Sequence, residues 1–137
     1  MLDLSCIKET FPYPVIVNEI IQHNQLNLPD LGDPHHNHKI LFQCRVAIVT
    51  GGTRNIGGGI SKELALRGAH VAMIYQNPAT SATSEAYARE LEGLGSGGRA
   101  VAILADVADA ATPALIVKET LEKLNVERID IVGTYFQ

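Results

Sequence analysis

The chain has 137 residues, of which 46% are hydrophobic, 15 are acidic and 11 are basic. This length and composition are ordinary for a single α/β domain. The formal net charge of −4 and the scattered basic residues exclude nucleic acid or an anionic membrane as the main partner. No apolar run reaches transmembrane length, and no basic segment leads into an apolar one near residue 1, so we expect a cytoplasmic protein with reduced thiols at Cys6 and Cys44.

Residues 1–40 differ in character from the rest of the chain. Residues 27–38 carry two prolines and a glycine and read as a loop, so we expect residues 1–40 to be an irregular N-terminal extension. Histidines cluster near its end, at positions 35, 36 and 38, but nothing there supplies a rigid tetrahedral set of ligands. We therefore predict no specific metal site, and we assign residues 41–137 to the folded domain.

A buried strand, a glycine-rich turn and a helix follow one another over residues 45–60. Residues 46–49 are consecutive apolar residues, as expected for a parallel strand buried on both faces. Glycines at positions 51, 52, 57, 58 and 59 would permit positive φ and a close approach of phosphate to the backbone. From Ile60 the pattern is helical, so the helix would direct its free amides at the turn. This arrangement predicts a cradle for a nucleotide pyrophosphate.

Two other glycine-rich motifs fit this turn less well. Gly52 and Gly57 match the Walker A form G-x-x-x-x-G-K-[ST], but Gly58 and Gly59 stand where its lysine and hydroxyl residue belong. The literal dinucleotide motif G-x-G-x-x-G is absent as well. A turn that binds no ligand is the remaining alternative, although five glycines in nine residues are an expensive way to build an ordinary turn.

The pattern Thr-Gly-x-x-x-Gly-x-Gly fits the turn better, and through it the chain resembles the short-chain dehydrogenase/reductase family. The matching residues are Thr50, Gly51, Ile56 and Gly57, with Gly52 and Arg54 matching the Thr-Gly-Gly-x-Arg variant common in NADP-dependent members. The resemblance runs from about Leu41 to Val132. It implies an α/β fold with a Rossmann-like, doubly wound parallel sheet, here incomplete at about four strands.

One residue of the turn departs from the family pattern. Asn55 stands where the middle glycine of the motif is usual. Asparagine is the non-glycine residue that best tolerates left-handed backbone geometry. We therefore expect the turn to form, with less room for the phosphates.

A second apolar strand, residues 71–75, is followed by the turn-rich residues 76–80. NAD-dependent folds place an Asp or Glu near this point to bind the ribose 2′-hydroxyl. Here the residues are Tyr75, Gln76 and Asn77. An acid would repel a 2′-phosphate, so its absence, together with the cationic Arg54, favours NADP(H) over NAD(H). The alternative for Tyr75 is that its ring simply packs at the strand end.

The next helix and strand are expected at residues 81–94 and 101–105. The strand runs into Asp106 and Val107. The resemblance implies that this pair holds the adenine ring, with the carboxylate accepting from the exocyclic amine and the valine covering the ring face. The alternative, compatible with the first, is that Asp106 caps the turn before the next helix.

A third helix over residues 113–124 and a fourth strand over residues 129–132 complete the pattern. A family member would continue from this strand into Asn-Asn-Ala-Gly, whereas this chain reads Gly-Thr-Tyr-Phe-Gln to residue 137. A half-sheet of four strands leaves an apolar edge unpaired. We therefore expect low stability, or self-association through the exposed sheet edge.

The catalytic residues that the resemblance implies do not occur in this sequence. The family uses a Ser and a Tyr-x-x-x-Lys pair, in which both side chains share a helical face and the ammonium stabilises the phenolate. None of the four tyrosines has a lysine four residues later. We therefore predict no catalytic residue and assign cofactor contacts to Gly51, Thr53, Arg54, Ile56, Gly57, Tyr75, Asp106 and Val107.

Three hypotheses about function follow. The first is an NADP(H)-dependent oxidoreductase of the short-chain type, acting on a small-molecule carbonyl or alcohol, with its catalytic half absent from this chain. The second is a non-catalytic NADP(H)-binding module that pairs with another chain. The third is an inactive truncated product. NADP(H) is the expected partner in the first two, and a small-molecule substrate is expected only if a catalytic half is supplied.

Overall fold

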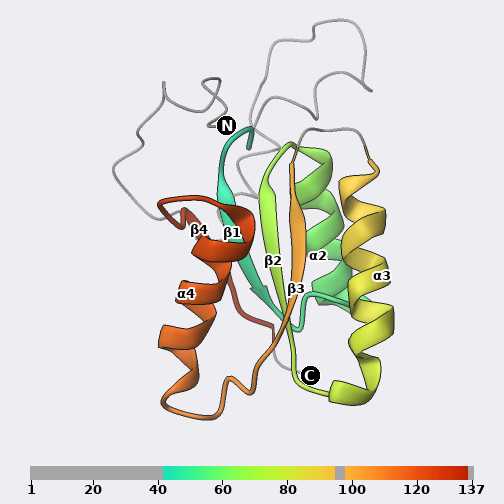
Figure 1. Ribbon diagram of the computed structural model, residues 1–137. Helices are drawn as coiled ribbons and strands as arrows, with labels where there is room; N and C mark the ends of the chain where they lie inside the picture. The colour runs from blue at the N-terminus through green and yellow to red at the C-terminus, as the bar shows by residue number, and fades with distance from the viewer. Residues whose placement is uncertain (1–41, 95–97, 136–137) are drawn as a thin grey trace, which may run out of the picture.

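The computed structural model describes residues 42–94 and 98–135, which form a parallel sheet with helices on both faces (Figure 1). The strand order is β3-β2-β1-β4. The elements are β1 (Val46–Thr50), α2 (Asn55–Leu66), β2 (His70–Tyr75), η3 (Pro78–Thr80), α3 (Ser81–Glu92), β3 (Ala100–Leu104), α4 (Thr112–Leu124) and β4 (Ile131–Gly133). The expected α/β fold with four parallel strands is confirmed. The expectations for residues 1–40 lie outside the described residues.

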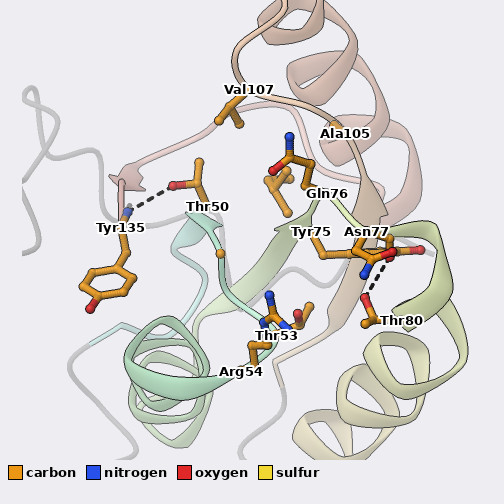
Figure 2. Close-up of a pocket in the computed structure, with 12 residues that line it drawn as sticks. Thr50, Thr53, Arg54, Tyr75, Gln76, Asn77, Thr80, Ala105, Val107 and Tyr135 are labelled. Atoms are coloured by element: carbon orange, nitrogen blue, oxygen red, sulfur yellow. Dashed lines mark hydrogen bonds between the residues drawn. The ribbon is translucent and has the colours of Figure 1, made fainter. Parts of the chain in front are cut away.

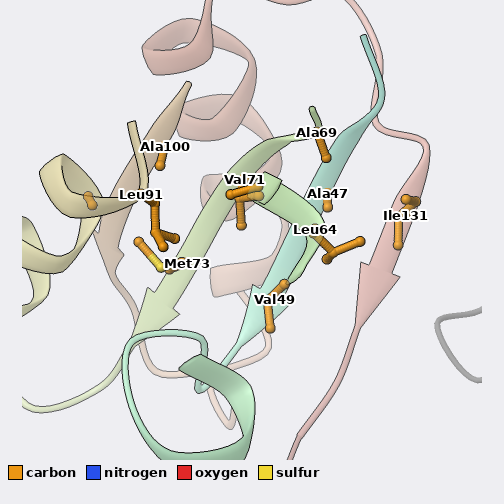
Figure 3. Close-up of a cluster of buried hydrophobic side chains, with 11 residues drawn as sticks. Ala47, Val49, Leu64, Ala69, Val71, Met73, Leu91, Ala100 and Ile131 are labelled. Atoms are coloured by element: carbon orange, nitrogen blue, oxygen red, sulfur yellow. The ribbon is translucent and has the colours of Figure 1, made fainter. Parts of the chain in front are cut away.

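The two central strands explain why the apolar runs were readable in the sequence. Every residue of β1 and β2 is buried, because each of these strands is paired on both edges and both faces of the sheet are covered. Helices α2 and α3 cover one face and α4 the other (Figure 1). The first face packs a cluster that includes Ala47, Val49, Leu64, Val71, Met73 and Leu91 (Figure 3). The second packs Val46, Ile48, Ile74, Ile116 and Leu124.

Helix α2 begins at Asn55, five residues before the helical pattern that we detected at Ile60. The positive φ that the glycines at 57–59 would permit is not used, because these residues form the first turns of the helix. Glycine has no side chain to contribute to hydrophobic periodicity and a poor intrinsic helix propensity, so the pattern concealed the true start. Positive φ occurs instead at Gly51 (63°) and Asn55 (52°). Asn55 thus adopts the left-handed geometry that we expected of it.

Strand β4 is short and lies at an edge of the sheet. It pairs with β1 alone within the described part of the chain, with Ile48 opposite Val132. The Asp130 carboxylate sets this register by accepting a hydrogen bond from the amide of Val46 (2.9 Å) and pairing with Arg45 (3.4 Å) and Arg128 (3.0 Å). Val132 itself is 56% exposed, so an apolar side chain faces outward on the edge strand of the described sheet.

The structure differs from the expectation of a reduced thiol at Cys44, because this residue is disulfide-bonded. The expectation of a reduced thiol was based on the cellular compartment in which such chains usually reside, and it carried no information about which sulfur atoms lie in contact.

Among the described residues, no helix has the length and apolar character needed to cross a membrane.

Candidate nucleotide-binding site

A cavity of about 270 Å³ lies at the carboxyl ends of the strands (Figure 2). Its walls come from four segments that are distant in sequence, because parallel strands all end at the same edge of the sheet. The lining residues are Thr50, Gly51, Thr53 and Arg54 after β1; Ile74, Tyr75, Gln76, Asn77 and Thr80 around the end of β2; Ala105 and Val107 after β3; and Tyr135 after β4.

The turn between β1 and α2 is closed directly against the first turn of the helix. A Cβ placed on Gly57 would overlap the carbonyl oxygen of Gly51, and one on Gly52 would lie 2.7 Å from the carbonyl oxygen of Val49. The hydroxyl of Ser61, which is fully buried, donates to the carbonyl of Gly52 (2.8 Å) and fixes the turn to the helix. The glycines at 52 and 57 are therefore required by close packing of backbone on backbone.

The amino end of α2 offers donors for an anion. Its first helical hydrogen bond runs from the amide of Gly58 to the carbonyl of Arg54 (2.8 Å), so the amides of residues 55–57 precede the helical ladder. No side chain caps this end, and no acidic residue stands in the first turn. Free amides and the positive end of the helix dipole together favour a bound phosphate.

Arg54 is the charged side chain among the twelve residues that line the cavity, which include no Asp or Glu. It is the residue immediately before α2, and it lies beside Thr53 at the foot of the cavity (Figure 2). Its guanidinium pairs with no carboxylate of residues 42–94 or 98–135, so its charge is not neutralised within the described part of the chain. The cavity is therefore electrostatically suited to an anionic ligand.

The wall around the end of β2 is held by local hydrogen bonds. The Tyr75 hydroxyl donates to the Ser81 hydroxyl (3.0 Å), so the ring both packs at the strand end and lines the cavity. The Asn77 side chain accepts from the amide of Ala79 (3.0 Å), and the Thr80 hydroxyl donates to the carbonyl of Asn77 (2.8 Å; Figure 2). These bonds order the loop before any ligand arrives.

Helix α3 also braces the phosphate turn. The Tyr87 hydroxyl donates to the carbonyl of Gly58 (2.7 Å), linking α3 to the second turn of α2. Burial of the phenol is the larger cause, and the nearby charge of Glu90 the smaller one, of a pKa of Tyr87 that is raised above its ordinary value. The hydroxyl therefore remains a protonated donor throughout the physiological pH range.

The structure gathers five of the eight predicted contact residues around the cavity, namely Gly51, Thr53, Arg54, Tyr75 and Val107. Ile56 is 57% exposed outside the cavity lining, and Gly57 lies inside α2 as a packing position. The Asp106 carboxylate accepts from the amide of Ala108 (2.9 Å), the turn-capping role that we gave as its alternative. Contact of all eight residues with a nucleotide stays a prediction.

Several lining residues were not assigned from the sequence, including Thr50, Thr80 and Tyr135. The amide of Tyr135 donates to the Thr50 hydroxyl (3.0 Å), which joins the ends of β4 and β1 (Figure 2). Thr50 and Tyr135 could have been predicted from their positions in the sequence, because residues at the ends of parallel strands lie at the same edge of the sheet. Thr80 had no such signal, since its place depends on the 3₁₀ turn η3.

A parallel sheet in this strand order, with a tight glycine turn leading into an uncapped helix, is the architecture of dinucleotide-binding proteins. The family model for short chain dehydrogenases matches residues 45–134, so the chain belongs to that family.

Individual relatives agree with this assignment. A hydroxynaphthalene reductase of Aspergillus fumigatus is 41% identical over 88 residues, covering 64% of this chain and 30% of the relative. A dehydrogenase/reductase structure from Sinorhizobium meliloti 1021 is 42% identical, with a TM-score of 0.61, covering 72% of this chain and 36% of that one. A short chain dehydrogenase from Burkholderia cenocepacia J2315, solved in complex with NADP, is 37% identical, with a TM-score of 0.58 and coverage of 66% and 35%. This chain spans about a third of the length of the curated relatives it matches.

Proposed function

We propose that this chain is the NADP(H)-binding part of a short-chain-type oxidoreductase that acts on a carbonyl or alcohol of a small molecule. The observation that carries the proposal is the Arg54 guanidinium, which lines the cavity. The residues that line the same cavity at the end of β2 include no Asp or Glu. A carboxylate there would bind a ribose 2′-hydroxyl and repel a 2′-phosphate, whereas an arginine attracts the phosphate. The relative from Burkholderia cenocepacia that was solved with NADP supports the same choice.

The residues present fit such a cofactor. The amides at the start of α2 would receive the pyrophosphate, next to the closely packed Gly51 and Gly57. Arg54 would hold the 2′-phosphate, with the hydroxyl of Thr53 beside it. Asp106 and Val107 would contact the adenine. When bound, the nicotinamide of NADP(H) supplies the hydride or accepts it.

A non-catalytic binding module is the second candidate for the chain on its own. The 137 residues contain no Tyr-x-x-x-Lys, the pair that would donate and tune the proton in the first proposal. The two candidates share the same nucleotide site and differ in whether a reacting centre is completed by further residues. Oxidation of NADPH with a panel of carbonyl compounds separates them, since a pure module binds NADPH without consuming it.

Binding of NADPH should raise the melting temperature of the chain more than binding of NADH. A ligand at ten times its Kd stabilises the folded state by about 1.4 kcal/mol, which raises Tm by about 5–10 °C in a domain of this size. Differential scanning fluorimetry with both cofactors at equal concentrations measures the difference. Equal shifts, or no shift with either, would contradict the cofactor assignment.

The exposed edge of β4 should promote self-association. Val132 is 56% exposed, and strand β4 has an unpaired edge within the described residues. We expect the sedimentation coefficient to rise with protein concentration, and the melting temperature to change with protein concentration as well. A soluble monomer with a sharp, concentration-independent transition would contradict this proposal.

A cytoplasmic location is proposed from the sequence alone. The disulfide at Cys44 argues the other way, because reducing compartments disfavour such bonds. Subcellular fractionation combined with thiol labelling of Cys44 tests the location directly.

A further inference from the structure

The amino-terminal half of α2 is a poor helix by its own sequence. Three consecutive glycines occupy positions 57–59, and glycine is the least favourable residue in a helix after proline. No side chain caps the start of the helix, and its first turn contains no acidic residue. The free amides of residues 55–57 therefore lie at the end of a helix whose sequence does little to order it.

Two side chains among the described residues hold this segment through hydrogen bonds to backbone carbonyls. Ser61 of α2 donates to the carbonyl of Gly52 (2.8 Å). Tyr87 of α3, 29 residues away from Gly58 in the sequence, donates to the Gly58 carbonyl (2.7 Å). A Cβ on the buried Gly58 would lie 3.7 Å from the Tyr87 ring, so the ring packs directly against the glycines. The Tyr87 hydroxyl thus ties the weak start of α2 to a second helix.

Helix α3 is a fixed support for this hydrogen bond. Its residues Ala88 and Leu91 are buried in the hydrophobic cluster on the same face of the sheet. At its amino end, Ser81 accepts a hydrogen bond from the Tyr75 hydroxyl (3.0 Å), which attaches α3 to the end of β2. The Tyr87 hydroxyl is therefore held in place relative to the sheet, and it holds the start of α2 in turn.

We propose that Tyr87 is a positioning residue for the phosphate site, because its hydroxyl keeps the start of α2 in the conformation that binds a pyrophosphate. The proposal rests on the proposed NADP(H) site, although Tyr87 itself is not among the residues that line the cavity. Without the hydroxyl, the helix start is ordered for a smaller fraction of the time, and the apparent affinity falls with that fraction. NADPH and NADH share the pyrophosphate, so both lose affinity by the same factor.

The variant Tyr87→Phe removes the hydroxyl and keeps the ring. Fluorescence titration at a temperature where the wild type and the variant are both folded should show NADPH and NADH weakened alike, by about three- to tenfold, because one hydrogen bond is lost. A role confined to stability would lower the melting temperature and leave both affinities within about twofold of wild type, which would overturn the proposal. A loss confined to NADPH would overturn it as well, since the hydroxyl would then act on the 2′-phosphate.

A second substitution in the Tyr87→Phe background tests whether the hydroxyl acts by ordering α2. Gly59→Ala raises the helix propensity at an exposed position where the added Cβ meets no atom within 4 Å. In Tyr87→Phe it should restore the NADPH affinity by at least about twofold, because the helix sequence then supplies part of the order that the hydroxyl supplied. No recovery would show that the hydroxyl acts by another route, and the proposal would fail.

Thr83→Val is the matched control, because it removes another hydroxyl of α3 that binds a backbone carbonyl, that of Thr80 (2.9 Å). Thr83 is exposed and does not line the cavity, so both affinities should stay within about twofold of wild type. A loss in Thr83→Val equal to that in Tyr87→Phe would overturn the assignment to Tyr87 while the NADP(H) site stands. If the wild-type chain binds neither cofactor, the NADP(H) site and the proposal both fail.

Discussion

Replacing Gly57 with alanine is expected to abolish measurable NADPH binding and to lower the free energy of unfolding by about 1–3 kcal/mol. The added Cβ would overlap the carbonyl oxygen of Gly51, and this neighbour is backbone that no rotamer change can move aside. The turn between β1 and α2 would have to open. The amides at the start of α2 would then lose their alignment with the pyrophosphate.

Gly59→Ala is the matched control, since it makes the same chemical change two residues along the same helix. A Cβ on Gly59 meets no atom within 4 Å, and the position is exposed. Alanine should therefore stabilise α2 by about 0.5–1 kcal/mol and leave NADPH binding unchanged. Urea denaturation and NADPH fluorescence titration of the two variants supply both measurements. If Gly57→Ala binds NADPH as well as Gly59→Ala does, the turn is not closed against the helix as described.

The central strands were predictable because a strand buried on both faces consists of consecutive apolar residues. Residues 46–49 lie in the centre of the sheet, and any polar residue there would lose its hydrogen bonds to water. Helix α4 was predicted to within one residue, since Pro113 marks its first turn and buried Ile116, Thr120 and Leu124 keep helical spacing. The start of α2 was not predictable in this way, because its first turns present glycines in place of apolar side chains.

The candidate site was predictable where it depends on local sequence, and less so where it depends on the meeting of distant segments. Gly51 and Arg54 were assigned from the turn itself, and both line the cavity. Tyr135 reaches the cavity only because β4 pairs with β1, and Thr80 reaches it through the 3₁₀ turn η3. Neither position carries a residue-level signal of ligand contact.

Replacing Arg54 with alanine should weaken NADPH binding by about 10- to 100-fold and change NADH binding by less than about threefold, because a charge-assisted contact to phosphate is worth about 1.5–3 kcal/mol. The guanidinium has no carboxylate partner among the described residues, so its removal breaks no ion pair there. Stability should therefore change little, and the loss should be specific to the 2′-phosphate. Fluorescence titration with each cofactor at fixed ionic strength measures both affinities.

Lys62→Ala is the matched control, because it removes one exposed positive charge from the same helix at a position outside the cavity. It should lower NADPH affinity by less than about twofold at physiological salt, where exposed charges more than about 8 Å apart are largely screened. Arg54→Lys should fall between wild type and Arg54→Ala, since an ammonium retains the charge without the planar fork that grips phosphate with two hydrogen bonds. Equal losses of NADPH and NADH in Arg54→Ala would show that Arg54 does not read the 2′-phosphate, and the preference for NADP(H) would then need another source.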